Sequence, residues 1–420
     1  MTDQAVRGRH LVTQGIATAG PVLVSVAHLS AQLVLMHRLS PNDFGVLALV
    51  LVAVQLGFGV SNALLGTPFT VTSNRTDAPQ RLTSVFVTLN LGFSLVCGAA
   101  VALLAIVLSS VWVGLGFGLF TALTQLRWFG RSYAYALHRP QDAAISDFAY
   151  ALAFGAALAV LLTTEATLVA VSSMFTLAAL AGLLGQPRFA HLCLMVRSSG
   201  LSDYRAIWRD QSRWTLTGVI STELTANAHS WLVGLIAGPA ALAPIAAAAL
   251  LFRPVMLVAT SLTQLERPIL TRALVAGNET LAQSHVRLFR SVLAVALLVT
   301  IAGGAVILLV QPHLLIPDTY ALADARLAFV LIGSSVALSV LRTPDSVVLQ
   351  AMGQFRSLAL ASVTSGVVAL AVAVVALFSL APVFSIIGPV AGQVVLGTLI
   401  ASTAKRAWAN AKKDEPCQKS

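Results

Sequence analysis

Apolar runs long enough to cross a membrane recur along nearly the whole chain, and they constrain its fold more than any other feature. A helix needs about 20 residues to span the hydrocarbon core. Only 10% of the residues are charged, whereas soluble domains carry about a quarter. The sequence therefore predicts an all-α polytopic membrane protein with little mass outside the bilayer.

Positive charge orients the predicted spans. We expect about twelve transmembrane helices, at roughly 11–37, 45–69, 83–108, 111–137, 143–163, 167–186, 212–237, 240–264, 288–310, 326–350, 357–380 and 383–404. All but three of the 26 lysines and arginines fall in the segments on one side; the exceptions are Arg38, Arg326 and the intramembrane Arg253. By the positive-inside rule, both termini are predicted to be cytoplasmic. The same rule explains the net charge of +10 without a nucleic-acid partner.

Several other classes of feature are not expected. The basic N-terminal stretch runs directly into a long span, which argues against a cleaved signal peptide. Cys97, Cys193 and Cys417 form no disulfide framework. We find no metal motif, phosphate-binding loop or nucleophile elbow, so we expect no cofactor, no metal and no enzymatic activity.

The longest polar connection divides the spans into two sets of six. We expect an N-terminal six-helix lobe at 1–186, a cytoplasmic connector at 187–211, a C-terminal six-helix lobe at 212–404 and a cytoplasmic tail at 405–420. The lobes look related, because Leu126-Arg127 resembles Leu341-Arg342 and Ala27-His28 resembles Ala228-His229. This predicts a parallel repeat, with a pseudo-two-fold axis along the membrane normal.

A family resemblance enters at the turn after the first span, Leu39-Ser-Pro-Asn-Asp-Phe-Gly45. It resembles the L-S-P-x-x-F-G turn typical of polysaccharide flippases in the multidrug/oligosaccharidyl-lipid/polysaccharide (MOP) exporter superfamily. Proline suits a tight turn, and we expect Asp43 to cap the next helix. The stretches from Gly238 to Pro254 and from Arg127 to Asp147 also resemble this family. The resemblance covers essentially the whole chain.

The resemblance implies a MATE-like transporter working by alternating access in the bacterial inner membrane. Its substrate would be a lipid-linked oligosaccharide, an undecaprenyl-diphosphate-linked repeat unit. The chain lacks the two additional C-terminal spans usual in lipid II flippases, which favours exopolysaccharide or O-antigen biosynthesis. Implied partners are membrane lipids, a polysaccharide polymerase and glycosyltransferases. Two alternatives stay open: a drug or small-molecule exporter of the same superfamily, and a membrane glycosyltransferase or polymerase.

Charges inside the membrane are the first candidates for the substrate site, because they are costly unless they serve a function. Glu223 in the seventh span and Arg253 in the eighth both lie about 17 Å from the inner end of their helix. We expect Arg253 to bind a diphosphate in a cavity between the lobes, with Glu223 as its partner when the site is empty. The alternative is a structural ion pair.

Further candidates occupy matching positions in the two predicted lobes. His28 and His229 have the pKa range needed for proton coupling, shared with Glu223, although neutral histidines between helices are the more frequent case. Arg127, Arg131 and Arg342 would form a basic vestibule for the diphosphate, with Asp345 as a possible partner of Arg342. Alternatively, they extend to the inner head groups. We expect Asp147 only to cap its helix or to pair with Arg139.

Overall fold

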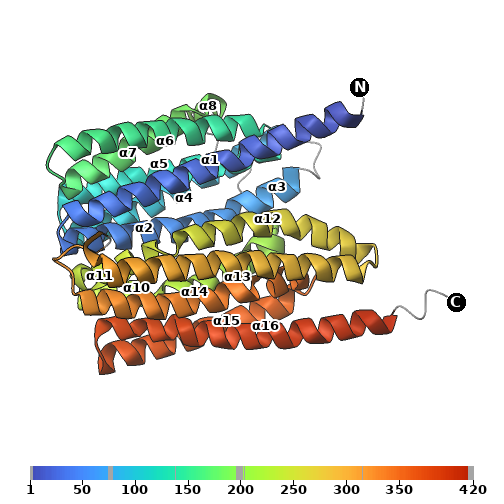
Figure 1. The fold of residues 1–420 in the computed structure, drawn as a ribbon. Coiled ribbons are helices and arrows are strands. Elements are labelled where there is room, and N and C mark those ends of the chain that lie inside the picture. The colour runs from blue at the N-terminus through green and yellow to red at the C-terminus, as the bar shows by residue number, and fades with distance from the viewer. Residues whose placement is uncertain are drawn as a thin grey trace. The chain divides into compact units, whose positions relative to one another are not determined.

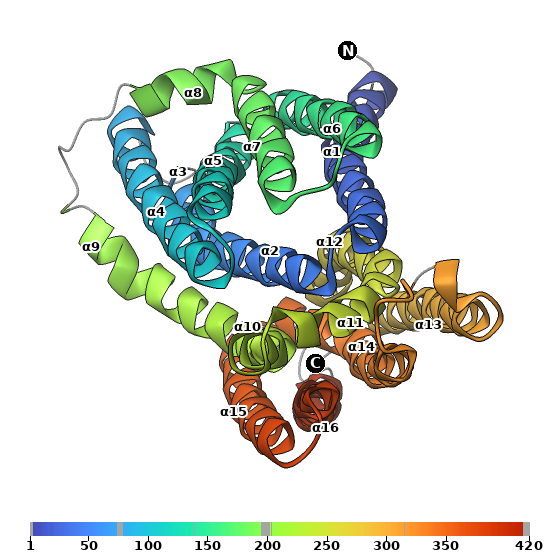
Figure 2. The same ribbon diagram turned by 90° about the vertical axis from the view of Figure 1, so that its left-hand side faces the viewer.

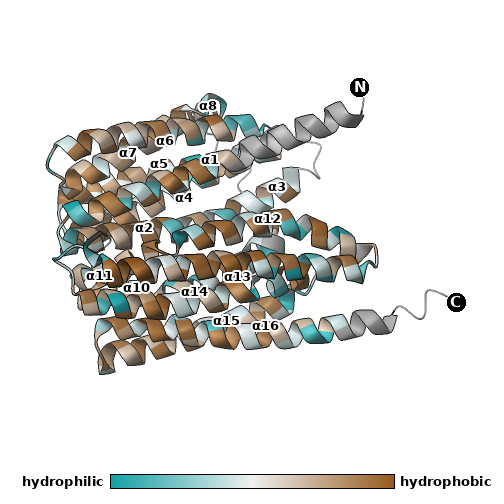
Figure 3. Cartoon of the chain, in the orientation of Figure 1, coloured by the Kyte–Doolittle hydropathy of each residue, from teal (hydrophilic) through white to brown (hydrophobic). Residues whose placement is uncertain are grey.

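The computed structural model describes residues 3–73, 79–137, 139–194, 202, 204–314 and 316–414. Every regular element in these ranges is a helix (Figure 1). The α-helices are α1 (Asp3–Arg38), α2 (Pro41–Ser61), α3 (Thr67–Ser73), α4 (Pro79–Leu108), α5 (Val111–Ala136), α6 (Pro140–Thr163), α7 (Leu168–Leu184), α8 (Pro187–Leu194), α9 (Tyr204–Ile207), α10 (Arg213–Leu232), α11 (Pro239–Leu250), α12 (Arg253–Val275), α13 (Glu279–Val310), α14 (Leu322–Ala351), α15 (Phe355–Ser379) and α16 (Ile387–Asp414). Hydrophobic residues predominate along the long helices (Figure 3).

Most of these helices fit a membrane by length and composition. Among the described residues, eight are long and apolar enough to cross one, and ten spans result if each of two bent helix pairs counts as one. The bent pairs are α7 with α8, at 95°, and α11 with α12, at 56°. Two further helices of 26 and 20 residues, α5 and α10, carry more polar side chains and complete the expected twelve. The predicted all-α polytopic fold is confirmed.

The chain divides into two compact units, residues 1–219 and 220–420. In the first unit α5 is the central helix, and it packs against α2, α4, α6 and α7 (Figure 2). Helix α6 packs against α7 on one side and α1 on the other. This arrangement surrounds α5 with other helices and buries the face of α6 that carries Ser146 and Asp147.

The second unit repeats this packing order with its own six spans. Helix α14 takes the central place and contacts α11, α12, α13 and α16, while α15 packs along α16. The second span departs from regular α-helix in each unit: a π-helical turn, Asn62–Gly66, lies between α2 and α3 within one continuous span, and a bend separates α11 from α12. The common order places Arg127 and Arg342 on corresponding central helices.

The turn at Leu39 shows how local chemistry starts a span. Ser40 is the N-cap of α2 and accepts a hydrogen bond from the Asp43 backbone N–H at 3.1 Å. Its hydroxyl donates to Asp43 Oδ2 at 2.8 Å, and Pro41 occupies the first helical position. The capping residue is therefore Ser40 and not the expected Asp43, whose carboxylate instead favours the positive end of the helix.

Two segments expected to be loops are helical. Helices α12 and α13 continue past the predicted spans and form a hairpin closed by Ala276–Asn278, where Gly277 adopts a φ of 68°. The connector contains α8, α9 and a π-helical turn at Trp208–Ser212. The Tyr204 hydroxyl donates to the Leu64 carbonyl oxygen at 2.6 Å, and burial raises the pKa of Tyr204. This bond ties the connector to the interrupted second span.

Candidate functional site

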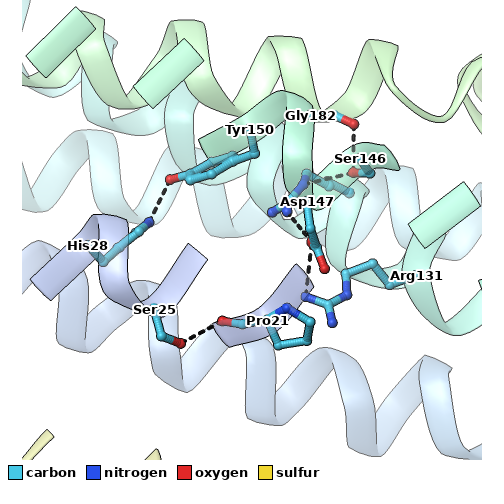
Figure 4. Close-up of polar contacts among 9 residues, drawn as sticks. Pro21, Ser25, His28, Arg131, Ser146, Asp147, Tyr150 and Gly182 are labelled. Atoms are coloured by element: carbon cyan, nitrogen blue, oxygen red, sulfur yellow. Dashed lines mark hydrogen bonds and ion pairs between the residues drawn. The ribbon is translucent and has the colours of Figure 1, made fainter. Parts of the chain in front are cut away.

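A buried ion cluster joins α5 and α6 in the first unit (Figure 4). Arg127 Nη2 lies 2.5 Å from Asp147 Oδ1, and Arg131 Nη1 lies 3.3 Å from the same oxygen. Arg127 is 4% exposed and Asp147 is fully buried. The expectation that Asp147 only caps its helix or pairs with Arg139 is therefore wrong, because the carboxylate holds two guanidinium groups of the facing helix.

Small residues around Arg127 make room for this cluster. Arg127 Nε donates to Ser146 Oγ at 3.0 Å, and Ser146 in turn donates to the Gly182 carbonyl oxygen at 2.7 Å. A Cβ on Gly182 would lie 2.6 Å from Arg127 Nε. Gly20 of α1 allows a similar close approach to Asp147 Oδ2, which has no hydrogen-bond partner among the described residues.

Aromatic rings extend the cluster toward α1. The Arg127 guanidinium lies 4.5 Å from the centre of the Tyr150 ring, and the Tyr150 hydroxyl is 2.7 Å from His28 Nε2 (Figure 4). The His28 ring stacks on Phe154 at 5.0 Å and meets the edge of Phe175 at 5.4 Å. His28 is therefore a hydrogen-bonded histidine within the helix packing of the first unit, and its part in proton coupling stays a prediction.

Substitution of Gly182 tests whether this packing is needed. The Gly182→Leu variant is expected to lose about 1–3 kcal/mol of stability, because the added side chain would displace Arg127 from Ser146. Gly155 of α6 is the matched control, since a Cβ there meets no atom within 4 Å. Gly155→Leu is expected to unfold at the wild-type temperature or slightly above it, because leucine has the higher helix propensity. Equal melting temperatures for Gly182→Leu and wild type would contradict this account.

The second unit holds Glu223 and Arg253 apart. The Glu223 carboxylate accepts a hydrogen bond from Asn227 Nδ2 at 2.7 Å, one turn further along α10. Arg253 is exposed, and no hydrogen bond or ion pair joins it to any described residue. The predicted Glu223–Arg253 pair is therefore wrong. The expected eighth span bends at Phe252, so Arg253 begins a new helix with Pro254 behind it.

Arg342 on α14 is held by neutral groups. Its Nε donates to Gln393 Oε1 at 3.0 Å, and Nη1 lies 3.4 Å from Ser346 Oγ. Asp345, the expected partner, accepts a hydrogen bond from Arg290 at 2.8 Å instead. Arg342 thus differs from Arg127, because its partners among the described residues are neutral and do not balance its charge.

His229 does not reproduce the surroundings of His28. It is 8% exposed, and its Nε2 lies 3.2 Å from the hydroxyl of the adjacent Ser230. His28 instead stacks on the rings of Tyr150 and Phe154 and meets the edge of Phe175, so it contacts three aromatic rings from two other helices. The two histidines occupy the same sequence pattern but different environments, so a shared coupling role for them stays a prediction.

Sequence comparison with protein-family models and with curated proteins finds no match. Solved structures match over nearly the whole chain. An inward-facing multidrug resistance MATE family transporter of the MOP superfamily has a TM-score of 0.69 at 13% identity, covering 93% of this chain and 96% of its own. The inward closed lipid II flippase MurJ has a TM-score of 0.71 at 9% identity, with 93% and 87% covered.

A MOP-superfamily transporter from Pyrococcus furiosus, whose binding pocket is described as having reverse polarity, has a TM-score of 0.58 at 13% identity, with 94% of each chain covered. These structures share one architecture despite low identity. The chain therefore has the MATE-like fold of MOP-superfamily transporters, and the predicted resemblance is confirmed for the fold.

Proposed function

We propose that this chain, folded like the MOP-superfamily exporters, is a flippase for a lipid-linked oligosaccharide. The substrate is an undecaprenyl-diphosphate-linked repeat unit that crosses the bacterial inner membrane by alternating access for exopolysaccharide or O-antigen biosynthesis. Both termini lie in the cytoplasm. Glycosyltransferases act before the transport step, and a polymerase acts after it.

The observation that carries this proposal is the uncompensated positive charge of the second unit. Arg253 has no partner among the described residues, and Arg342 has neutral ones. Phe252, beside Arg253, packs against Gly333 of α14, and nine residues further along that helix, about 13 Å, lies Arg342. A ladder of two guanidinium groups suits an anion that moves along the membrane normal, because guanidinium binds phosphate oxygens in bidentate pairs.

The arginines of the first unit have a structural role in this proposal and do not bind the substrate directly. Arg127 and Arg131 share the Asp147 carboxylate, and Arg127 is buried. We propose that they hold α5 and α6 together and contribute one net positive charge to the surrounding field. Glu223, whose carboxylate has one neutral partner, is the proposed coupling acid.

Transport in liposomes tests the function directly. The purified chain would be reconstituted with a labelled undecaprenyl-diphosphate-linked oligosaccharide, and access of an impermeant glycosidase to the sugar would be measured over time. We expect faster exposure than in empty liposomes, and strong slowing by Arg342→Gln. Arg326→Gln is the matched control, because among the described residues the Arg326 side chain donates only to the Leu308 carbonyl oxygen.

The drug-exporter alternative is favoured by one observation, the Glu223 carboxylate, which would attract a cationic drug. The same liposomes loaded with a cationic dye separate the two functions. Export of the dye while the lipid-linked sugar stays in place would overturn the flippase proposal.

A further inference from the structure

Five buried polar side chains of the first unit lie on α2, α4 and α5. They are Ser61, Asn90, Ser94, Thr124 and Gln125. None is more than 4% exposed. Together they carry six side-chain nitrogen or oxygen atoms that have no hydrogen-bond partner among the described residues. We name this set the polar layer.

The inner boundary of the polar layer is an aromatic cluster. Leu65, Phe86 and Phe129 belong to one buried core, and the rings of Phe86 and Phe129 are 6.4 Å apart. Residues one helical turn away on the same face are four positions away in sequence. That step leads from Leu65 to Ser61, from Phe86 to Asn90 and from Phe129 to Gln125, so all three enter the same level of the bundle.

The outer boundary is formed by close helix contacts. Gly57 of α2 faces the Gln125 amide, whose Nε2 donates to the Val54 carbonyl oxygen at 3.1 Å. A Cβ on Gly98 of α4 would lie 3.0 Å from Ala122 Cβ of α5. Helix α5 is thus in close contact with α2 at the level of Gln125 and with α4 at the level of Ala122.

The charge and the hydrogen-bonding groups of the polar layer indicate which kind of molecule could bind there. The five side chains are neutral, so they offer no charge to compensate a bare ion, which is costly to bury. Asn90 Nδ2 can only donate a hydrogen bond, the amide oxygens of Asn90 and Gln125 only accept, and the hydroxyls do both. A small neutral molecule that both donates and accepts satisfies such a set. Buried water in proteins makes about three hydrogen bonds of this kind.

We infer that the junction of α2, α4 and α5 is an internal hydration site, where water molecules bind Ser61, Asn90, Ser94, Thr124 and Gln125. The site directly precedes the π-helical turn Asn62–Gly66. Irregular backbone at membrane depth is tolerated where ordered water, neighbouring helices or side chains complete its hydrogen bonds. The proposed water therefore lies at the level where α2 passes into the π-helical turn.

In-situ X-ray radiolysis tests this inference, because hydroxyl radicals formed from bound water oxidise the side chains next to it. Phe86 and Phe129 border the polar layer and are 0% and 1% exposed. Phe117, on the same helix as Phe129, and Phe154 are equally buried at 0% and lie outside the layer. We expect Phe86 and Phe129 to be oxidised several-fold faster than the two controls. Equal rates at all four rings would overturn the inference.

A second comparison identifies the occupant. The triple substitution of Asn90→Leu, Ser94→Ala and Thr124→Val should lower the oxidation of Phe129 to the rate of Phe117, and persistence of the wild-type rate would contradict the assignment. If this variant does not fold, a wild-type structure at about 2 Å decides: water density beside the Asn90 amide supports the site, and its absence refutes it. The oxidation rate of Phe129 in the wild-type protein should be the same in sodium and choline buffers. Loss of the signal in choline would show a cation site instead.

Discussion

Replacement of Asp147 by alanine is expected to destabilise the protein by about 3–5 kcal/mol, because it leaves a buried guanidinium without its counter-charge. Arg127 is 4% exposed and would keep only Ser146 and the Tyr150 ring as partners. Arg131 would lose the same carboxylate. The effect would be measured as a fall in the thermal unfolding temperature of the purified protein and in its abundance in the membrane.

The matched control is Asp142→Ala, which removes a carboxylate from the same helix. Asp142 lies 3.5 Å from Arg188, and both side chains are partly exposed, so this pair should contribute at most about 1 kcal/mol. The double variant Arg127→Met with Asp147→Leu should recover much of the lost stability, because an apolar replacement of a buried pair is often close to neutral. An Asp147→Ala protein as stable as Asp142→Ala would show that the cluster does not hold α5 to α6.

Hydropathy and charge predicted the spans because both reflect the bilayer itself. A long apolar run must be helical in hydrocarbon, whatever its neighbours. The repeat pattern also placed Arg127 and Arg342 correctly on corresponding helices. The capping residue of α2 was missed by three positions, since Ser40 and Asp43 are both good caps and only the helix start distinguishes them.

Side-chain partners could not be predicted in the same way, because they depend on how a span bends and which face it turns. The Glu223–Arg253 pair assumed a straight eighth span, whereas the chain bends by 56° and restarts its helix at Arg253. A helix that restarts resets the directions of all its side chains. Pro254, at the second position of the new helix, was the sequence signal for that interruption.

The Arg127–Asp147 pair had a usable signal. The two residues lie at similar distances from the turn that joins α5 to α6, so antiparallel packing brings them to the same depth. The same depth comparison fails for Glu223 and Arg253 because the chain bends before Arg253. Between two unbroken helices it would have given the right partner. The polar layer had a weaker signal, since only Asn90 and Gln125 among its members are unusual residues within a span.

The two units share a fold but differ in how the arginine on the central helix is paired. In the first, Arg127 on the central helix is neutralised by Asp147 on the next helix. In the second, Arg342 on the corresponding helix is bound to Gln393, and the nearby Asp345 is bound to Arg290. The charge of Arg127 is balanced by a carboxylate within the protein, whereas the charge of Arg342 is not balanced by its partners. We propose that this difference directs the anionic substrate to the second unit.

Arg253→Ala is expected to weaken the binding of a diphosphate-linked substrate by about tenfold to a hundredfold. This corresponds to the loss of a charge-assisted hydrogen bond, about 1.5–3 kcal/mol. Arg253→Lys should keep part of the activity, because the charge stays while the planar fork is lost. Export of the lipid-linked sugar in liposomes and in cells would measure both effects, with the amount of inserted protein determined for each variant.

The control for position is Arg356→Ala, since Arg356 is also exposed but lies at the start of α15. Its export rate should equal that of the wild type. Glu223 gives an independent comparison: it is bound to Asn227, so Glu223→Gln should leave substrate binding intact while it reduces coupled transport. Export by Arg253→Ala at the wild-type rate would remove Arg253 from the substrate site. A loss of binding in Glu223→Gln as large as in Arg253→Ala would restore the idea that the two side chains act as one unit, which the structure contradicts by bending the chain between them.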